Sequence, residues 1–331
     1  MALSRRSSLI QSGTLVFVTC FIASSSIIRA SAPSDAVRIT AVANVTLRAT
    51  PSSTAPAVAQ LPLGTEVIES GPSGLDKTWV QVRLPDAREG WVQSSFTRPL
   101  DPVWRWPVFD RIISERLGRK GDGFPAGVEL VAFIERVAPE YTDKDGRARV
   151  ELARLKALSS TAGAVPFKQS NREPYASWLA ARKEQVVYDE PGGRWMVRPE
   201  LVWKTHAAYS SSAIADDLAW FAVSTGLPGE CEGEVSCYLS AFNRLQGEYL
   251  RRHPAGRRAA ESVDVLAQST ERLAPAGKVA PAYTFDRGGC QDMVKAVDGL
   301  SAAIKDTRAA ARDRALTSLG AIKKLCGLEG F

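Results

Sequence analysis

The sequence contains very little histidine, and this scarcity limits the chemistry that the chain can carry out. Among 331 residues only His206 and His253 are histidines, and neither has a cysteine, serine or carboxylate partner at a recognisable spacing. A zinc amidase needs two or three histidine ligands, and a cysteine peptidase needs a thiolate within reach of a histidine. A glycine-rich loop that could cradle phosphate is also missing. The sequence therefore predicts no catalytic residue, no metal and no cofactor.

Excess charge and long apolar runs are also scarce. The formal charge is +6, and three of these charges, Arg5, Arg6 and Arg29, belong to an N-terminal leader, so +3 remains on the mature chain. This is too little to indicate a nucleic-acid partner. Outside the leader no run approaches the roughly 20 apolar residues of a membrane-spanning helix, so no stable membrane insertion is expected once the leader is removed.

The leader has the three parts of a signal peptide. Arg5 and Arg6 are followed by an apolar stretch over residues 15–28 and by the small-residue pattern Ala30-Ser31-Ala32. These features predict cleavage near Ala32 and a periplasmic or secreted protein, with an uncleaved anchor as the alternative. Residues 4–9 resemble a twin-arginine export signal, although an ordinary basic start is the favoured interpretation, so the export route stays open.

Four of the five cysteines lie beyond the leader, which contains Cys20. The even number that remains is expected in an oxidising compartment. Four cysteines allow three connectivities. A short loop between Cys231 and Cys237 could close without strain, and by elimination Cys290 would then pair with Cys326. The cysteine spacings match no zinc pattern.

Short alternating runs dominate residues 33–100. Apolar and polar residues alternate over 44–51, 61–67, 77–84 and 89–92, and each run is closed by Gly, Pro, Asp or Ser. This pattern is typical of half-buried antiparallel strands joined by turns. The region resembles bacterial SH3 (SH3b) domains in four motifs: Val45-x-Leu47-Arg48 with Pro51-Ser52 following, Leu63-Gly64-Thr65, Trp79-Val80-x-Val82 and Gly90-Trp91-Val92.

The resemblance implies a small all-β barrel that recognises a cell-wall peptide or a segment of an envelope protein. The candidate ligand-binding residues are Arg48, Trp79, Arg83 and Trp91, because aromatic faces near cations suit extended peptides and carboxylates. The strand pattern points Trp79 inward, which favours core packing for this residue. Trp91 lies next to a turn, where ligand contact and packing are both open.

Residues 101–184 are predicted to form a helical linker region. It opens with Trp104 and Trp106 in a proline-bounded segment. Such aromatic linkers usually fold back onto a neighbouring domain, with an exposed contact surface as the alternative. Apolar spacing then predicts helices over 108–117, 128–137, 149–158 and 177–184. The loop Asp143-Lys144-Asp145-Gly146 does not fit a calcium loop, because Tyr141 and Leu152 would occupy its first and last ligand positions.

Residues 185–331 are predicted to be a mainly helical, repeat-like domain that begins with a β-hairpin over 185–197. Helices are expected over 200–209, 214–223, 238–252 and 257–273. The stretch 242–260 resembles one tetratricopeptide-type helix pair. An unbroken helix from Cys290 to Cys326 would separate its ends by about 54 Å, far beyond disulfide reach. The chain must therefore turn back near Gly299 or within 305–314 if these two cysteines pair.

Together these features predict a multidomain chain, with an SH3-like barrel followed by a mainly α-helical region with one β-hairpin. The predicted function is an exported, non-catalytic binding protein that uses the barrel to recognise cell-wall peptide or an envelope protein segment. The disulfide-stapled helical domain would be a second interaction surface. The alternative is a peptidoglycan hydrolase of carboxylate type, because two carboxylates leave no short motif. Glu230, Glu232 and Glu234 cluster, but their loop indicates exposed charge.

Overall fold

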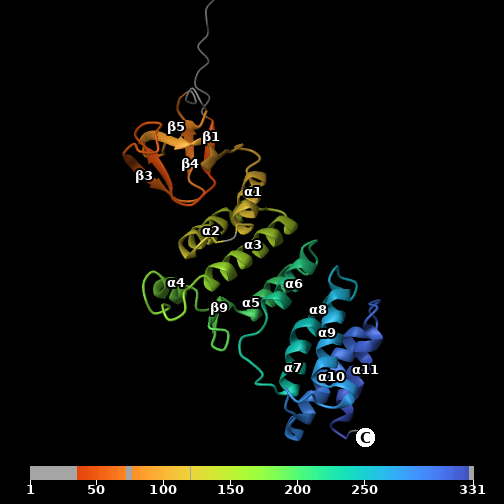
Figure 1. Cartoon of the computed structure of the whole chain (residues 1–331). Coiled ribbons are helices and arrows are strands. Elements are labelled where there is room, and N and C mark those ends of the chain that lie inside the picture. The colour runs from red at the N-terminus through yellow and green to blue at the C-terminus, as the bar shows by residue number, and fades with distance from the viewer. Residues whose placement is uncertain (1–35, 72–76, 120, 328–331) are drawn as a thin grey trace, which may run out of the picture. The chain divides into compact units, whose positions relative to one another are not determined.

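The structure, a computed structural model, describes residues 36–71, 77–119 and 121–327 (Figure 1). The predicted signal peptide, with Cys20, lies outside the described residues. All of these described residues belong to one unit. A seven-stranded antiparallel sheet is followed by a mostly helical region that contains a two-stranded hairpin, so the predicted fold class is confirmed.

The N-terminal sheet, called the barrel below, has the strand order β3-β2-β6-β5-β4-β1-β7. Its buried residues are the alternating apolar positions of the predicted strands, among them Val45, Leu47, Val80, Val82 and Val92. The strands are β1 (Val37–Thr40), β2 (Val45–Arg48), β3 (Ala57–Leu61), β4 (Glu66–Glu69), β5 (Trp79–Arg83), β6 (Glu89–Gln93) and β7 (Thr97–Pro99).

Gly90 allows β6 to approach β2 closely. A Cβ atom on Gly90 would lie 2.7 Å from the carbonyl oxygen of Arg48 and 2.8 Å from Cγ of Leu47. Any side chain at this position would push the two strands apart. The glycine of the Gly90-Trp91-Val92 motif therefore has a packing role, and it brings Trp91 directly opposite Arg48 in the pairing of β6 with β2.

The described part of the central region consists of three long helices, three shorter ones and a hairpin. Asp143, the first residue of the Asp143–Gly146 segment, caps the next helix: its Oδ1 accepts a hydrogen bond from the Gly146 N–H. The elements are α1 (Trp106–Leu117), α2 (Phe124–Val137), α3 (Lys144–Gly163), α4 (Tyr175–Ala181), β8 (Val186–Asp189), β9 (Arg194–Val197), α5 (Pro199–Ala208) and α6 (Ala215–Thr225).

One large core cluster draws residues from the barrel, from α1 to α3 and from α5 and α6. Phe109 and Phe133 meet edge to face at its centre, with ring centroids 5.8 Å apart, and Ile39 and Leu63 of the barrel belong to the same cluster. The Leu63 N–H donates to Oε2 of Glu129 at 2.8 Å, and the Arg136 guanidinium donates to the Leu63 carbonyl at 2.9 Å. The barrel is thus joined to α2 by shared apolar packing and by hydrogen bonds.

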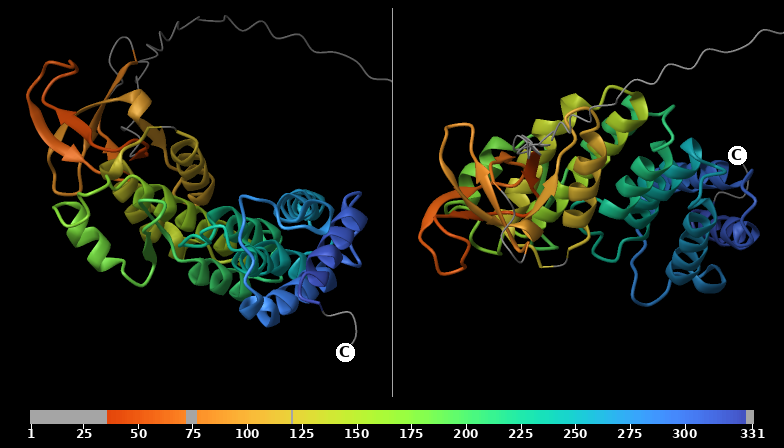
Figure 2. Two further views of the ribbon diagram at one scale, coloured as in Figure 1. Left: turned by 60° about the horizontal axis from the view of Figure 1, so that its bottom comes forward. Right: turned by 90° about the horizontal axis from the view of Figure 1, so that it is seen from above.

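The C-terminal helices form a second core cluster. They are α7 (Val235–Phe242), a π-helical turn η3 (Asn243–Gly247), α8 (Glu248–Arg252), α9 (Ala259–Leu273), α10 (Cys290–Ile304) and α11 (Arg312–Lys324). Helix α9 packs against α11, and α10 packs against both α7 and α11, as the blue helices show in Figures 1 and 2. The tetratricopeptide likeness of residues 242–260 is not confirmed.

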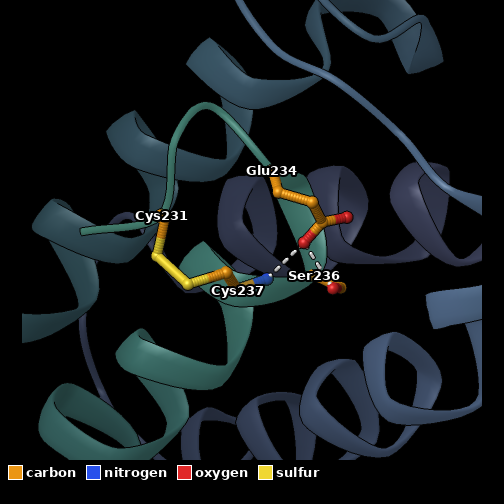
Figure 3. Close-up of a disulfide and its surroundings, with 4 residues drawn as sticks. All are labelled: Cys231, Glu234, Ser236 and Cys237. Atoms are coloured by element: carbon orange, nitrogen blue, oxygen red, sulfur yellow. Dashed lines mark hydrogen bonds between the residues drawn. A yellow bond between two sulfur atoms is a disulfide. The ribbon is translucent and has the colours of Figure 1, made fainter. Parts of the chain in front are cut away.

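Two disulfides join the same cysteine pairs that the sequence predicts. Cys231 and Cys237 close a short loop at the start of α7 (Figure 3). Cys290 at the start of α10 is bonded to Cys326 just after α11, with Cα atoms 5.7 Å apart. The helical hairpin required by this bond turns between Ile304 and Arg312, which is the second of the two turning points that the sequence left open.

Candidate ligand-binding face of the barrel

Three adjacent strands place polar and aromatic side chains in one row on the barrel surface. Arg48 of β2 is paired with Trp91 of β6, and Trp91 is paired with Gln81 of β5. The side chains of neighbouring residues point to opposite faces of a strand. Because Leu47, Val80, Val82 and Val92 fill the barrel core, this row faces away from it.

The row is half-buried, and hydrogen bonding holds one of its members in place. Nη1 of Arg48 donates to the carbonyl of Ala55 at 2.6 Å, which holds the guanidinium in place. Arg83 lies two residues beyond Gln81 on the same face of β5 and is paired in register with Glu89. Its side chain is exposed and makes no hydrogen bond or ion pair with the described residues. Arg83 thus has its donors available for an incoming carboxylate.

Trp79 has a different environment. It is only 9% exposed and therefore packed, but the inward direction that the strand pattern favoured is wrong. It lies next to Val80 and so projects from the side of β5 opposite to Val80 and Val82. An indole this deeply buried offers little surface to a ligand, so Arg48, Arg83 and Trp91 form the accessible part of the predicted set.

The sheet and its strand order lie in a region that also matches a known family by sequence. Residues 43–98 match the family model of the bacterial SH3 domain. The chain carries a bacterial SH3 domain. No curated protein and no solved structure matches the chain.

The SH3 domain indicates a module that binds cell-wall components or proteins. The described part of the chain contains no helix that is long and apolar enough to cross a bilayer. Within the same residues, no three or more histidine, cysteine or acidic side chains gather as metal ligands do. The match to the bacterial SH3 family is therefore the finding that bears on function.

The two histidines, which looked isolated in the sequence, are in direct contact. Nε2 of His206 lies 2.8 Å from Nε2 of His253, and Nη1 of Arg252 donates to Nδ1 of His206 at 3.4 Å. Since Nδ1 accepts from the arginine, the network assigns the hydrogen of neutral His206 to Nε2, which donates to His253. No sequence spacing signals this pair, because His206 belongs to α5 and His253 follows α8.

Burial and neighbouring charge keep both imidazoles neutral. His206 is 2% exposed, and desolvation, followed by His253 and Arg252, lowers its pKa from 6.5 to about 4. Desolvation also lowers the pKa of His253, with Arg252 acting in the same direction and Asp216 against it. The pair is therefore an uncharged link between α5 and the end of α8, with His206 buried and His253 half-buried.

Two further predictions about exposure are wrong. Trp104 and Trp106 do not fold back onto a neighbour: they are 62% and 43% exposed. The main-chain N–H groups of Val103 and Trp104 donate to Asp101, which holds the segment in a turn and turns Trp104 outward.

Glu234 is half-buried instead of being freely exposed like Glu230 and Glu232. Burial raises its pKa, but hydrogen bonds from the Ser236 hydroxyl and the Cys237 N–H outweigh this and hold the pKa below its ordinary value (Figure 3). Glu234 therefore caps α7 and has a structural task.

Proposed function

We propose that this protein is an exported, non-catalytic binding protein whose SH3 domain recognises an extended peptide of the cell wall. The row formed by Arg48, Trp91 and Gln81, with Arg83 beside it, is the surface that takes the ligand. The observation that carries the proposal is the pairing of Arg48 with Trp91 across two strands of a barrel that matches the bacterial SH3 family. The helical region supplies a second interaction surface.

The chemistry of the row suits a peptide with acidic groups. A flat indole offers apolar area at a low cost in conformational entropy, and arginine forms forked hydrogen bonds with carboxylates. The Arg48 guanidinium is already anchored to Ala55, so little side-chain freedom is lost when a ligand binds there.

Export agrees with the disulfides. The two bonds at Cys231–Cys237 and Cys290–Cys326 persist in oxidising compartments and are rare in the cytosol. Together with the predicted signal peptide they support a periplasmic or secreted location.

A co-sedimentation assay with purified peptidoglycan tests the proposal on the full mature chain. Trp91→Ala and Arg83→Gln should each weaken pelleting, and for the tryptophan we expect a loss of about tenfold or more. Two matched variants serve as controls: Trp104→Ala removes an exposed tryptophan outside the row, and Arg88→Gln removes a barrel arginine that is paired with Asp86. Both should pellet like the wild type.

Two outcomes would overturn the wall-binding proposal. If the wild-type protein stays in the supernatant, the partner is a different envelope component, such as a protein segment. If the turbidity of the peptidoglycan suspension falls in the presence of the protein, and a single Glu or Asp substitution prevents this, the chain is a hydrolase of carboxylate type.

A further inference from the structure

A π-helical turn interrupts the long helical stretch between Val235 and Arg252. Asn243–Gly247 forms this turn between α7 and α8 (Figure 1). Such turns are rare and occur frequently at functional sites, because the extra residue pushes side chains out of the regular helix surface. Here the turn contains Arg244, which reaches toward Glu200 on α5.

Two cavities of about 420 Å³ each meet at this turn, and together we call them the Arg244 groove. The first is lined by Trp203, Glu248 and Arg252 among others, and the second extends to Tyr238 and the Cys231–Cys237 disulfide. Leu227 and Arg244 line both cavities. A ligand that fills both cavities therefore contacts Arg244 and extends to both sides of this residue.

The walls of the groove are held in place before any ligand arrives. The loop after Leu227 is fixed at one point by the Gly229 N–H, which donates to Oδ1 of Asp189 at 3.0 Å. The Cys231–Cys237 disulfide fixes its other end (Figure 3). A preorganised wall lowers the entropic cost of binding.

The three arginines of the groove differ in how they are bound. Arg251 donates to Glu248 and to both the side chain and the carbonyl of Asn243. Arg252 also pairs with Glu248, and its guanidinium lies over the Trp203 ring, 5.2 Å from the centroid.

Arg244 is 63% exposed, and its nearest charged partner is Oε1 of Glu200 at 3.8 Å, beyond hydrogen-bond distance. Among the described residues it has no hydrogen-bond partner. Arg244 is thus the guanidinium in the groove that can receive a ligand.

The charges around Arg244 favour a single carboxylate over a polyanion. Glu200 and Glu248 line the first cavity with the three arginines, and Glu230 lines the second, so the groove as a whole carries no excess charge. A polyphosphate or nucleic acid would meet these carboxylates as well. Trp203, Leu227 and Tyr238 add apolar contact on both sides of Arg244. A peptide with one acidic side chain between apolar side chains would match this arrangement.

We propose that the Arg244 groove binds a short extended peptide that carries one carboxylate. The carboxylate forms a forked pair with Arg244, and the apolar side chains on either side of it enter the two cavities. This site is separate from the SH3 row and does not depend on what the SH3 domain binds.

Fluorescence anisotropy with three labelled pentapeptides tests the proposal on the full mature chain. The first has a central glutamate between leucines and blocked ends, the second has glutamine in its place, and the third is the glutamine peptide with a free C-terminal carboxylate. We expect the glutamate peptide to bind about tenfold more tightly than the blocked glutamine peptide. Tight binding of the third peptide would identify a terminal carboxylate as a second source of the same group.

Variants decide whether the preference comes from Arg244. Arg244→Gln should abolish the difference between the acidic and neutral peptides, and Arg244→Glu should favour a peptide with a central lysine. Arg272→Gln is the matched control, because Arg272 is an exposed helical arginine outside both cavities.

Three results would overturn the proposal. The first is that no peptide binds at millimolar concentration. The second is that the Arg244→Gln variant still prefers the glutamate peptide to the glutamine peptide. The third is that an oligothymidylate binds more tightly than the glutamate peptide. The Trp91→Ala variant keeps its peptide binding if the two sites are separate, so failure here is distinguishable from failure of the SH3 proposal.

Discussion

The contact between buried His206 and half-buried His253 predicts that the protein loses stability between pH 7.5 and pH 5. His206 is 2% exposed and hydrogen-bonded to His253, and Arg252 faces its other ring nitrogen. Protonation of His206 in the folded protein would place a second cation beside Arg252. Its folded-state pKa is therefore about 4, against 6.5 when the side chain is solvated.

The sign and size of the effect follow from proton linkage. As the pH falls below 6.5, His206 becomes protonated in the unfolded chain, whereas in the folded protein it stays neutral down to about pH 4. The unfolded state therefore binds more protons over this range, and the free energy of unfolding falls as the pH falls. For these two pKa values the loss is about 2 kcal/mol at pH 5. His253 has a lowered pKa as well and acts in the same direction.

Urea denaturation followed by tryptophan fluorescence at pH 7.5, 6.5, 5.5 and 5 measures this loss. The chain has only two histidines, so no other imidazole contributes. Carboxylates with lowered pKa values, such as Asp216 and Glu248, stabilise the fold above their ordinary pKa of about 4 and lose this contribution at lower pH. Most of this carboxylate loss falls below pH 5, so the chosen range reports mainly on the histidines.

The matched control is the double variant His206→Gln, His253→Gln, which has no imidazole. Its absolute stability differs from that of the wild type, but its free energy of unfolding should change little between pH 7.5 and 5. The reasoning is refuted if the double variant loses as much stability as the wild type over this range. A His206 imidazole that titrates near pH 6.5 in NMR spectra of the folded protein would refute it equally.

The remaining predictions concern the fold. Gly64 has φ +77°, and a Cβ atom there would lie 2.2 Å from Cδ2 of Phe133, so Gly64→Ala should destabilise the protein by about 1–3 kcal/mol from backbone strain alone. Equal urea midpoints for the variant and the wild type would contradict this. Cys290→Ser opens a bond between residues 36 apart and should cost about 4 kcal/mol without reductant. With reductant the difference from wild type should disappear, and a difference that persists would contradict the role of the bond.

The sequence alone indicated the barrel, most of the helices and the favoured cysteine pairs of this protein. Alternating apolar residues and closing turns identified the barrel, because the inward face of a strand must be apolar wherever it is buried. The even number of cysteines and the short Cys231–Cys237 loop indicated the pairs. Disulfide reach then required the chain to turn between α10 and α11, where Ile304 and Arg312 now bound the turn.

Only the tertiary structure decided which elements meet. His206 and His253 lie 47 residues apart, and their contact depends on how α5 packs beside α8. The outward position of Trp104 depends on a turn held by Asp101, and the Arg244 groove depends on a π-helical turn that leaves no periodic signal. Periodicity records which face of an element is apolar. The partner that covers this face, and the polar groups brought together around it, are set by packing between segments far apart in the chain.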